Sequence, residues 1–82
     1  MDIKEFLDKY LPLECVFVNN VHKITYETHD NRKPFMMVEV EVRENLEEPD
    51  QFKLLHETHK LVKLFGLESC IGAVGVKVIS LF

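Results

Sequence analysis

Two histidines three positions apart are the residues whose type and spacing most directly suggest chemistry. His56 and His59 lie in the stretch HETHK, and this spacing makes them neighbours on one side of a helix. Imidazole binds zinc, nickel and copper, but a protein metal site needs at least a third ligand. The other two histidines and the two cysteines show no metal-binding spacing. We predict no metal and no cofactor, and keep a metal- or small-molecule-binding domain using His56 and His59, with His22 as a further ligand, as an alternative.

A row of carboxylates is the second group with possible chemistry. We call it the acidic row: Glu39, Glu41, Glu44, Glu47, Glu48 and Asp50. On a strand, Glu39 and Glu41 would share a face about 7 Å apart, a separation compatible with paired catalytic carboxylates. A chain of 82 residues rarely encloses the sizeable pocket that active sites prefer. We therefore predict that the protein is not an enzyme and has no catalytic residues.

Composition narrows the class of protein further. The 82 residues are 46% hydrophobic and 29% charged, which is typical of one globular domain spanning 1–82. The net charge of -4 disfavours direct binding to a nucleic-acid backbone. Charges near the N-terminus and the absence of a long apolar run predict a cytoplasmic protein without a membrane segment. For such a protein we expect Cys15 and Cys70 to be reduced and buried.

The N-terminal third predicts a helix followed by strands. Apolar residues at helical spacing extend from Ile3 to Leu11, Asp2 is the expected N-cap, and Pro12 is expected to end the helix. Strand-type residues follow on both sides of Asn19-Asn20, so this pair predicts a tight hairpin turn, with a bulge in one long strand as the alternative. Residues 30–34 predict a second turn.

The segment 35–43 alternates cleanly, so its faces can be assigned. Met36, Val38, Val40 and Val42 are predicted to face the core, while Met37 and the glutamates face outward. Pairing back across the second turn predicts Ile24 and Tyr26 on the core face, with His22 at its margin. Lys23 is then expected to form a cross-strand pair with a glutamate.

The C-terminal half predicts a helix and a last strand. The helix starts at 46 or 50, after a capping box of Asn45 and Glu48, and runs to 65, where Gly66 stops it. Residues 70–82 are apolar on both alternating faces, so we expect a strand that is central or covered by another chain, with its two glycines marking a bulge or a close backbone approach. The expected order is α-β-β-β-α-β: an α+β two-layer sandwich with a mainly antiparallel or mixed sheet and both helices on one face.

The leading prediction for function is a small acidic, non-enzymatic protein-protein interaction module that self-associates as a homodimer through its sheet. The predicted self-association residues form an exposed apolar patch: Val16, Val18, Val21, Met37 and Val76. An alternative is an inhibitor of the phage anti-defence or immunity type, whose acidic row occupies a nucleic-acid-binding or active-site groove of a basic partner. We also predict a basic helix face, a solvated stripe that could dock an acidic partner or a phosphate: Lys53, His56, Lys60 and Lys63.

Overall fold

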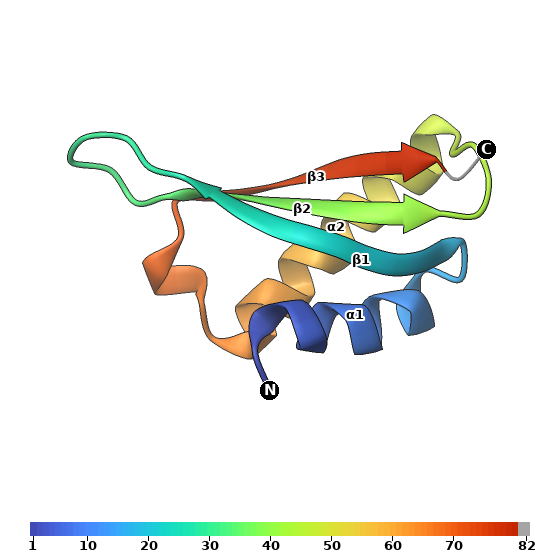
Figure 1. Ribbon diagram of the computed structural model, residues 1–82, viewed down its shortest axis with the longest axis horizontal. Helices are drawn as coiled ribbons and strands as arrows, with labels where there is room; N and C mark the ends of the chain where they lie inside the picture. The colour runs from blue at the N-terminus through green and yellow to red at the C-terminus, as the bar shows by residue number, and fades with distance from the viewer. Residues whose placement is uncertain (81–82) are drawn as a thin grey trace.

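A computed structural model describes residues 1–80 of the chain, as two helices packed against a three-stranded sheet (Figure 1). The elements, in chain order, are α1 (Ile3–Glu14), β1 (Val18–Glu27), β2 (Phe35–Val42), α2 (Glu48–Phe65), a short 3-10 helix η1 (Glu68–Cys70) and β3 (Ala73–Ser80). The predicted α+β class with two layers is confirmed. Neither helix in the described part of the chain is long and apolar enough to cross a membrane.

The sheet is mixed and has the strand order β1-β2-β3. β1 pairs antiparallel with β2. The chain then crosses over through α2, and β3 pairs parallel with β2 on its other side. β2 is therefore the central strand, and β3 lies at an edge rather than in the centre. The residues Leu81 and Phe82, which belong to the predicted last strand, lie outside the described residues.

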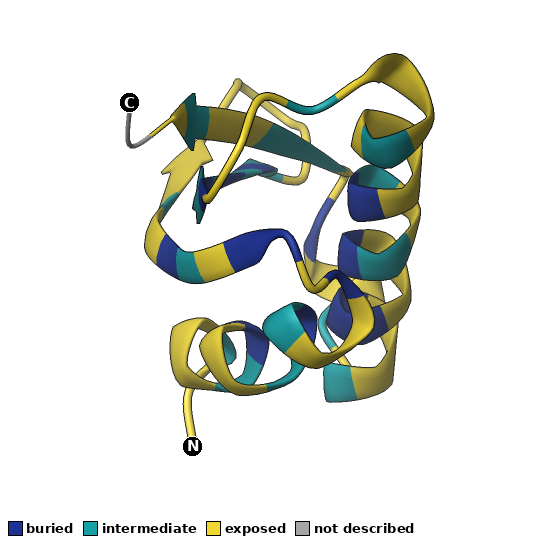
Figure 2. Cartoon of the chain, turned by 90° about the vertical axis from the view of Figure 1, so that its right-hand side faces the viewer, coloured by how far each residue is buried: buried dark blue, intermediate teal, exposed yellow. Residues whose placement is uncertain are grey.

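The core lies between the sheet and the helices, which cover the same face of the sheet (Figure 2). As predicted, Met36, Val38, Val40 and Val42 all point into it and are 0% exposed. α1 contributes Leu7 and Leu11, and α2 contributes Leu54, Leu61 and Val62. On this shared face α1 packs against β1 and α2 packs against β3, and the two helices also contact each other.

The end of α1 differs from the prediction. Pro12 lies inside the helix, which continues to Glu14. Proline lacks the N–H that would bond the carbonyl one turn back, yet the following turn still closes, because the Cys15 N–H donates to the Leu11 carbonyl at 2.8 Å. At the other end the predicted cap is confirmed, since the Glu5 N–H donates to Asp2 Oδ1 at 2.8 Å.

The predicted tight turn at Asn19-Asn20 is not formed. Both asparagines lie within β1, and the pairing register with β2 shifts on either side of them, between Val18 and Asn20 and between Val21 and Lys23. This is the bulged long strand that the sequence left as an alternative. The reason is tertiary: the backbone N–H of Val21 donates to Asp8 Oδ1 of α1 at 2.8 Å, which ties the bulged stretch to the helix.

The register of the remaining hairpin agrees with the predicted faces. Ile24 lies opposite Val38 and Tyr26 opposite Met36, on the core side, although Tyr26 reaches beyond the helices and is 49% exposed. The second turn is formed as expected, with Asn31 at φ 60°.

α2 starts and stops close to the predicted positions. Its N-cap is Glu47, which makes no side-chain cap hydrogen bond, so the predicted capping box of Asn45 and Glu48 is not formed. Pro49 occupies the first turn, where its missing N–H costs no helical bond. Gly66 ends the helix as predicted, in the left-handed region at φ 101°.

Candidate interaction site

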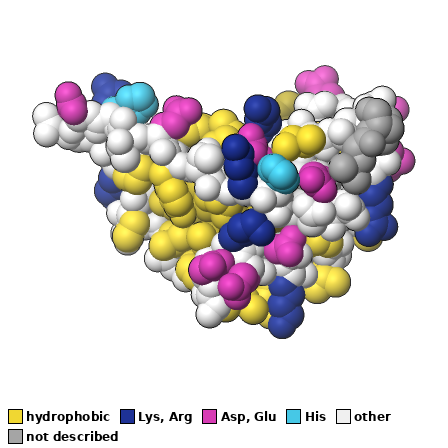
Figure 3. Space-filling view, viewed as in Figure 1, with side chains coloured by type: hydrophobic (Ala, Val, Ile, Leu, Met, Phe, Trp, Pro, Cys, Tyr) yellow, Lys and Arg dark blue, Asp and Glu magenta, His cyan; other side chains and the backbone are white. Residues whose placement is uncertain are grey.

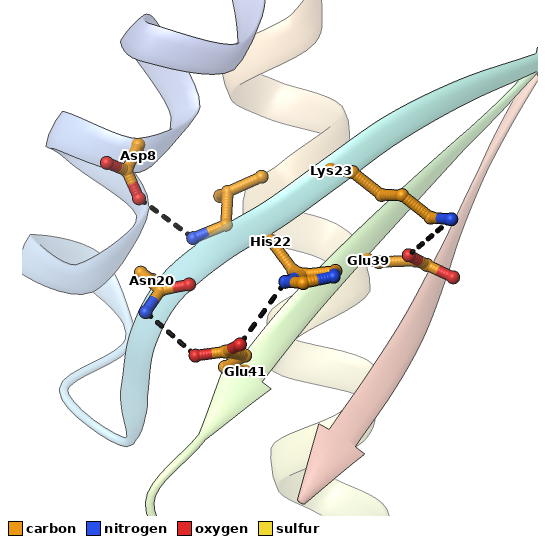
Figure 4. A network of polar contacts seen from close by, with 7 residues as sticks. Asp8, Asn20, His22, Lys23, Glu39 and Glu41 are labelled. Atoms are coloured by element: carbon orange, nitrogen blue, oxygen red, sulfur yellow. Dashed lines mark hydrogen bonds and ion pairs between the residues drawn. The ribbon is translucent and has the colours of Figure 1, made fainter. Parts of the chain in front are cut away.

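The open face of the sheet carries a polar network across all three strands. Figure 4 shows the contacts that join β1 to β2. Glu39 lies in the middle strand at 12% side-chain exposure, with Lys23 Nζ of β1 at 3.7 Å and Lys77 Nζ of β3 at 3.6 Å. The predicted cross-strand pair of Lys23 with a glutamate is therefore confirmed. Because each carboxylate oxygen of Glu39 lies near a lysine, the negative charge of Glu39 is compensated within the chain.

Glu41 is engaged in the same way one step further along β2. Its carboxylate accepts a hydrogen bond from Asn20 Nδ2 at 2.9 Å and lies 3.3 Å from His22 Nδ1. The bulge in β1 turns His22 outward to this contact, so His22 is not at the margin of the core as predicted. In a space-filling view basic, acidic and histidine side chains intermingle in the middle of the visible face (Figure 3).

The acidic row is thus divided between two environments. Glu39 and Glu41 are half-buried and paired on the sheet, whereas Glu44 and Glu47 are exposed in the connection to α2. The remaining two members, Glu48 and Asp50, belong to the first turn of α2, where acidic side chains interact favourably with the helix dipole. The four members outside the sheet, Glu44, Glu47, Glu48 and Asp50, lie close to the N-terminus of α2. None of these four carboxylates forms an ion pair within residues 1–80.

The predicted self-association residues are not brought together. Val18 and Val21 are core residues at 0% and 2% exposure, because the bulge in β1 turns them inward. Val16 is 76% exposed in the connection between α1 and β1, and Met37 is half-buried on the open face. Val76 lies in β3 on the opposite face, so the five residues form no single patch.

The basic helix face is present as predicted, with Lys53, His56, Lys60 and Lys63 all exposed on α2. The last three line a cavity of about 330 Å³ between the C-terminal half of α2 and the start of β3. Two of the lysines already have acidic neighbours: Lys60 Nζ is 3.5 Å from Glu57 and Lys63 Nζ is 4.0 Å from Glu68. Each of these two lysine charges is therefore partly compensated within the chain.

The HETHK histidines have separate environments. His59 Nε2 lies 3.0 Å from the Val74 carbonyl oxygen, which can only accept, so this nitrogen carries the proton and donates. His56 lines the neighbouring cavity. Within residues 1–80, no group of three or more His, Cys, Asp or Glu side chains is arranged to hold a metal ion.

The two cysteines also differ from each other. Cys15 is buried as predicted, and burial, the main cause, raises the pKa of its thiol above the ordinary value of 9.0. Cys70 is exposed, contrary to the prediction, because it lies in η1 at the surface. Both are free thiols.

The free edge of β3 is the feature that sequence reasoning missed. In a strand, the backbone groups of successive residues alternate between the two edges. Since the Val74 carbonyl meets His59 rather than β2, the backbone of Val74 faces the free edge. By the same alternation Val76 and Val78 also direct their N–H and C=O groups outward. The apolar pattern of residues 70–82 is a sequence signal for a strand with buried or covered faces. It does not show that the strand lies at an edge of the sheet, because that depends on the strand order.

A groove of apolar side chains runs beside this edge. It lies between the N-terminal half of α2 and the inner face of β3, with a volume of about 650 Å³. Phe52 is 63% exposed and Val78 is 39% exposed, and Leu55, Val74 and Val76 are half-buried. We call this groove together with the free backbone edge the β3 edge site. Within residues 1–80, it joins the outward backbone groups of Val76 and Val78 to partly uncovered apolar surface.

The other edge of the sheet is protected. β1 carries two register shifts, and its outward N–H at Val21 is bonded to Asp8. Bulges and capped edge groups are devices that prevent another strand from adding. β3 has an uninterrupted register with β2 over Phe35–Val42, and its one charged residue, Lys77, points to the open face toward Glu39. The contrast makes β3 the edge on which a strand can add.

Comparison with protein families, curated proteins and solved structures finds no significant match to this chain.

Proposed function

We propose that this chain is a non-enzymatic protein-protein interaction module that binds an extended segment of another protein chain at the β3 edge site. The supporting observation is that the outward backbone groups of Val76 and Val78 lie beside exposed apolar side chains of α2. An added strand gains main-chain hydrogen bonds from the edge, and its side chains gain apolar contacts from the groove. An unprotected apolar edge is otherwise an aggregation hazard, which natural proteins avoid.

The amino-acid sequence predicted association through an apolar patch on the sheet. The proposed binding surface is instead the edge of the sheet at β3. The open face has little apolar surface to offer at its centre, where Glu39, Lys23 and Lys77 form a compensated ion-pair cluster. The inhibitor alternative has weaker support, because two members of the acidic row are engaged within the chain. A metal-dependent function has no geometric support among the described residues.

Site-specific photo-cross-linking in the cells that make the protein tests this proposal. A photoreactive phenylalanine analogue at Val78 should give a covalent adduct with another protein chain, while the same group at Leu64 should give little. Leu64 is the matched control, because it is 76% exposed on α2 and does not line the groove of the β3 edge site.

A second change shows whether the backbone edge is responsible. Val76→Pro removes an outward N–H that β2 does not use, and proline is tolerated on edge strands. The adduct from position 78 should then fall strongly. Equal adducts from positions 78 and 64, or an adduct that Val76→Pro leaves unchanged, would contradict binding at the β3 edge site.

A further inference from the structure

We infer that the chain occupying the β3 edge site is a second copy of this protein, paired antiparallel about a two-fold axis. This inference rests on the proposed function and names its partner. It is carried by a charge asymmetry along α2, which borders the whole length of the site.

The start of α2 is rich in acidic side chains, and its end carries two exposed lysines. Beside Val76 and Val78 the helix begins with Glu47, Glu48 and Asp50, and Glu48 itself lines the groove. Beside Val74 the helix presents His56 and the exposed side chains of Lys60 and Lys63, each of which also has a carboxylate neighbour within the chain, Glu57 and Glu68 respectively. The macrodipole of the helix has the opposite polarity, so each set of charges is also stabilised where it lies.

Antiparallel pairing of two β3 strands aligns these ends correctly. It extends the sheet from three strands to six and brings the two α2 helices into one layer on the same face, running in opposite directions. The acidic start of each helix then faces the basic end of its partner, twice in every dimer. A parallel arrangement would instead place like charges together and could not close under a two-fold axis.

The side chains of β3 favour one register. With the axis at Val76, the two Val76 residues exchange both backbone hydrogen bonds, and Val74 of each copy lies opposite Val78 of the other. On the open face Gly75 then lies opposite the second copy's Lys77. Moving the axis by one residue would put the two Lys77 side chains directly opposite each other, which is destabilising.

The register is compatible with the hydrogen bond from His59. The carbonyl oxygen of Val74 has two lone pairs, so it can accept from His59 and from the N–H of Val78 of the second copy. Pairing about Val76 also places β-branched valines of the two copies opposite each other on the groove side of the sheet. There Phe52 and Leu55 of each copy supply further apolar contacts.

Charge exchange between two variants tests the arrangement. Sedimentation equilibrium of the purified wild-type chain should show dimers of the 9.6 kDa protomer. Glu48→Lys alone and Lys60→Glu alone should each weaken dimerisation by about tenfold, since each creates two like-charge contacts. A one-to-one mixture of the two variants should recover an affinity close to that of the wild type, as a heterodimer in which both contacts are again of opposite sign.

Matched controls separate pairing from folding. Glu5→Lys changes the same charge in the first turn of α1, and Lys9→Glu makes the opposite change on that helix, away from the site. Neither should alter dimerisation, and their mixture should show no preference for heterodimers. Recovery in the mixed sample cannot come from a folding defect, because each chain still carries its own substitution.

Each other outcome overturns the inference in a different way. A wild-type chain that stays monomeric excludes the second copy as the occupant, while cross-links from position 78 to a different protein would still support the proposed function. A dimer that survives Val78→Glu lies at another surface. A dimer that loses affinity with Val78→Glu but shows no heterodimer preference pairs through the edge in a different orientation.

Discussion

A buried thiol gives the clearest consequence at the scale of one residue. The raised pKa of Cys15 means that the folded protein holds the thiol neutral where the unfolded chain would release its proton. The thiol therefore has no effect on the pH dependence of stability at neutral pH. As the pH rises past 9.0, the unfolded state loses protons first, and the free energy of unfolding decreases until the folded-state pKa is reached.

Cys15→Ala should remove this part of the pH dependence. Urea denaturation from pH 7 upward should show that the wild type loses stability above pH 9.0 more steeply than the variant. Alkylation gives an independent measurement, because the exposed Cys70 should react rapidly in the native state and Cys15 only after unfolding. Equal reaction rates for the two thiols would show that Cys15 is accessible in the native state.

At the scale of elements, α1 and β1 are joined by one hydrogen bond that also shapes the strand. The Asp8 carboxylate accepts the outward N–H of Val21 at 2.8 Å. Asp8→Ala would leave this donor part-buried and unsatisfied, so we expect a loss of about 1 to 3 kcal/mol of stability. Asp8→Asn retains an acceptor oxygen and should lose less. Chemical denaturation of both variants checks the order, and equal losses would mean that the hydrogen bond contributes little.

A close approach between β2 and β3 explains one of the glycines in the last strand. A Cβ at Gly75 would come within 2.7 Å of the Phe35 ring and 3.3 Å of the Met37 side chain, so the close neighbours are side chains rather than the backbone that the sequence suggested. Gly75→Ala should therefore destabilise the chain by about 1 to 3 kcal/mol. Phe35→Leu in the same chain should recover part of the loss. Additive losses in a double-mutant cycle would contradict a direct clash between these positions.

The elements that sequence predicted well are those determined by local periodicity. The alternation of Met36 to Val42 and the helical spacing from Ile3 to Leu11 are local signals. The strand face that the first predicts is confirmed, and Leu7 and Leu11 of the helix lie in the core. The Asn19-Asn20 segment shows the limit of local signals. Its residues favour a hairpin turn, but a carboxylate on α1 holds a neighbouring N–H and keeps the strand continuous.

At the scale of the whole molecule, the shape offers a direct check on association. The protomer has a Cα radius of gyration of 12.4 Å and extents of 39 × 23 × 20 Å. Pairing through β3 widens the sheet, so small-angle X-ray scattering should give a radius that increases with concentration. Val78→Glu should remain at the protomer value throughout, whereas Leu64→Glu should behave like the wild type. A concentration-independent radius for the wild type at the protomer value would contradict self-association.

The candidate site could not have been predicted from sequence, because it depends on strand order. The apolar residues of β3 indicated a central or covered strand, and the charged residues indicated an acidic row and a basic helix face. Their combination along one groove arises only when α2 returns the chain to the outside of β2. A different feature, the bulge in β1, moved Val18 and Val21 from the predicted surface into the core.

The parallel pairing of β2 with β3 also has a kinetic consequence. Phe35 pairs with Ala73 and Val42 with Ser80, so this half of the sheet forms only after the chain closes a loop that contains all of α2. Closing such a loop reduces the entropy of the chain before the stabilising contacts between the strands have formed. Long-range pairing of this kind therefore slows folding. Until that step, β2 has one open side and β3 has two. The transient species most prone to misassembly is then one in which the β1-β2 hairpin has formed and β3 has not yet docked.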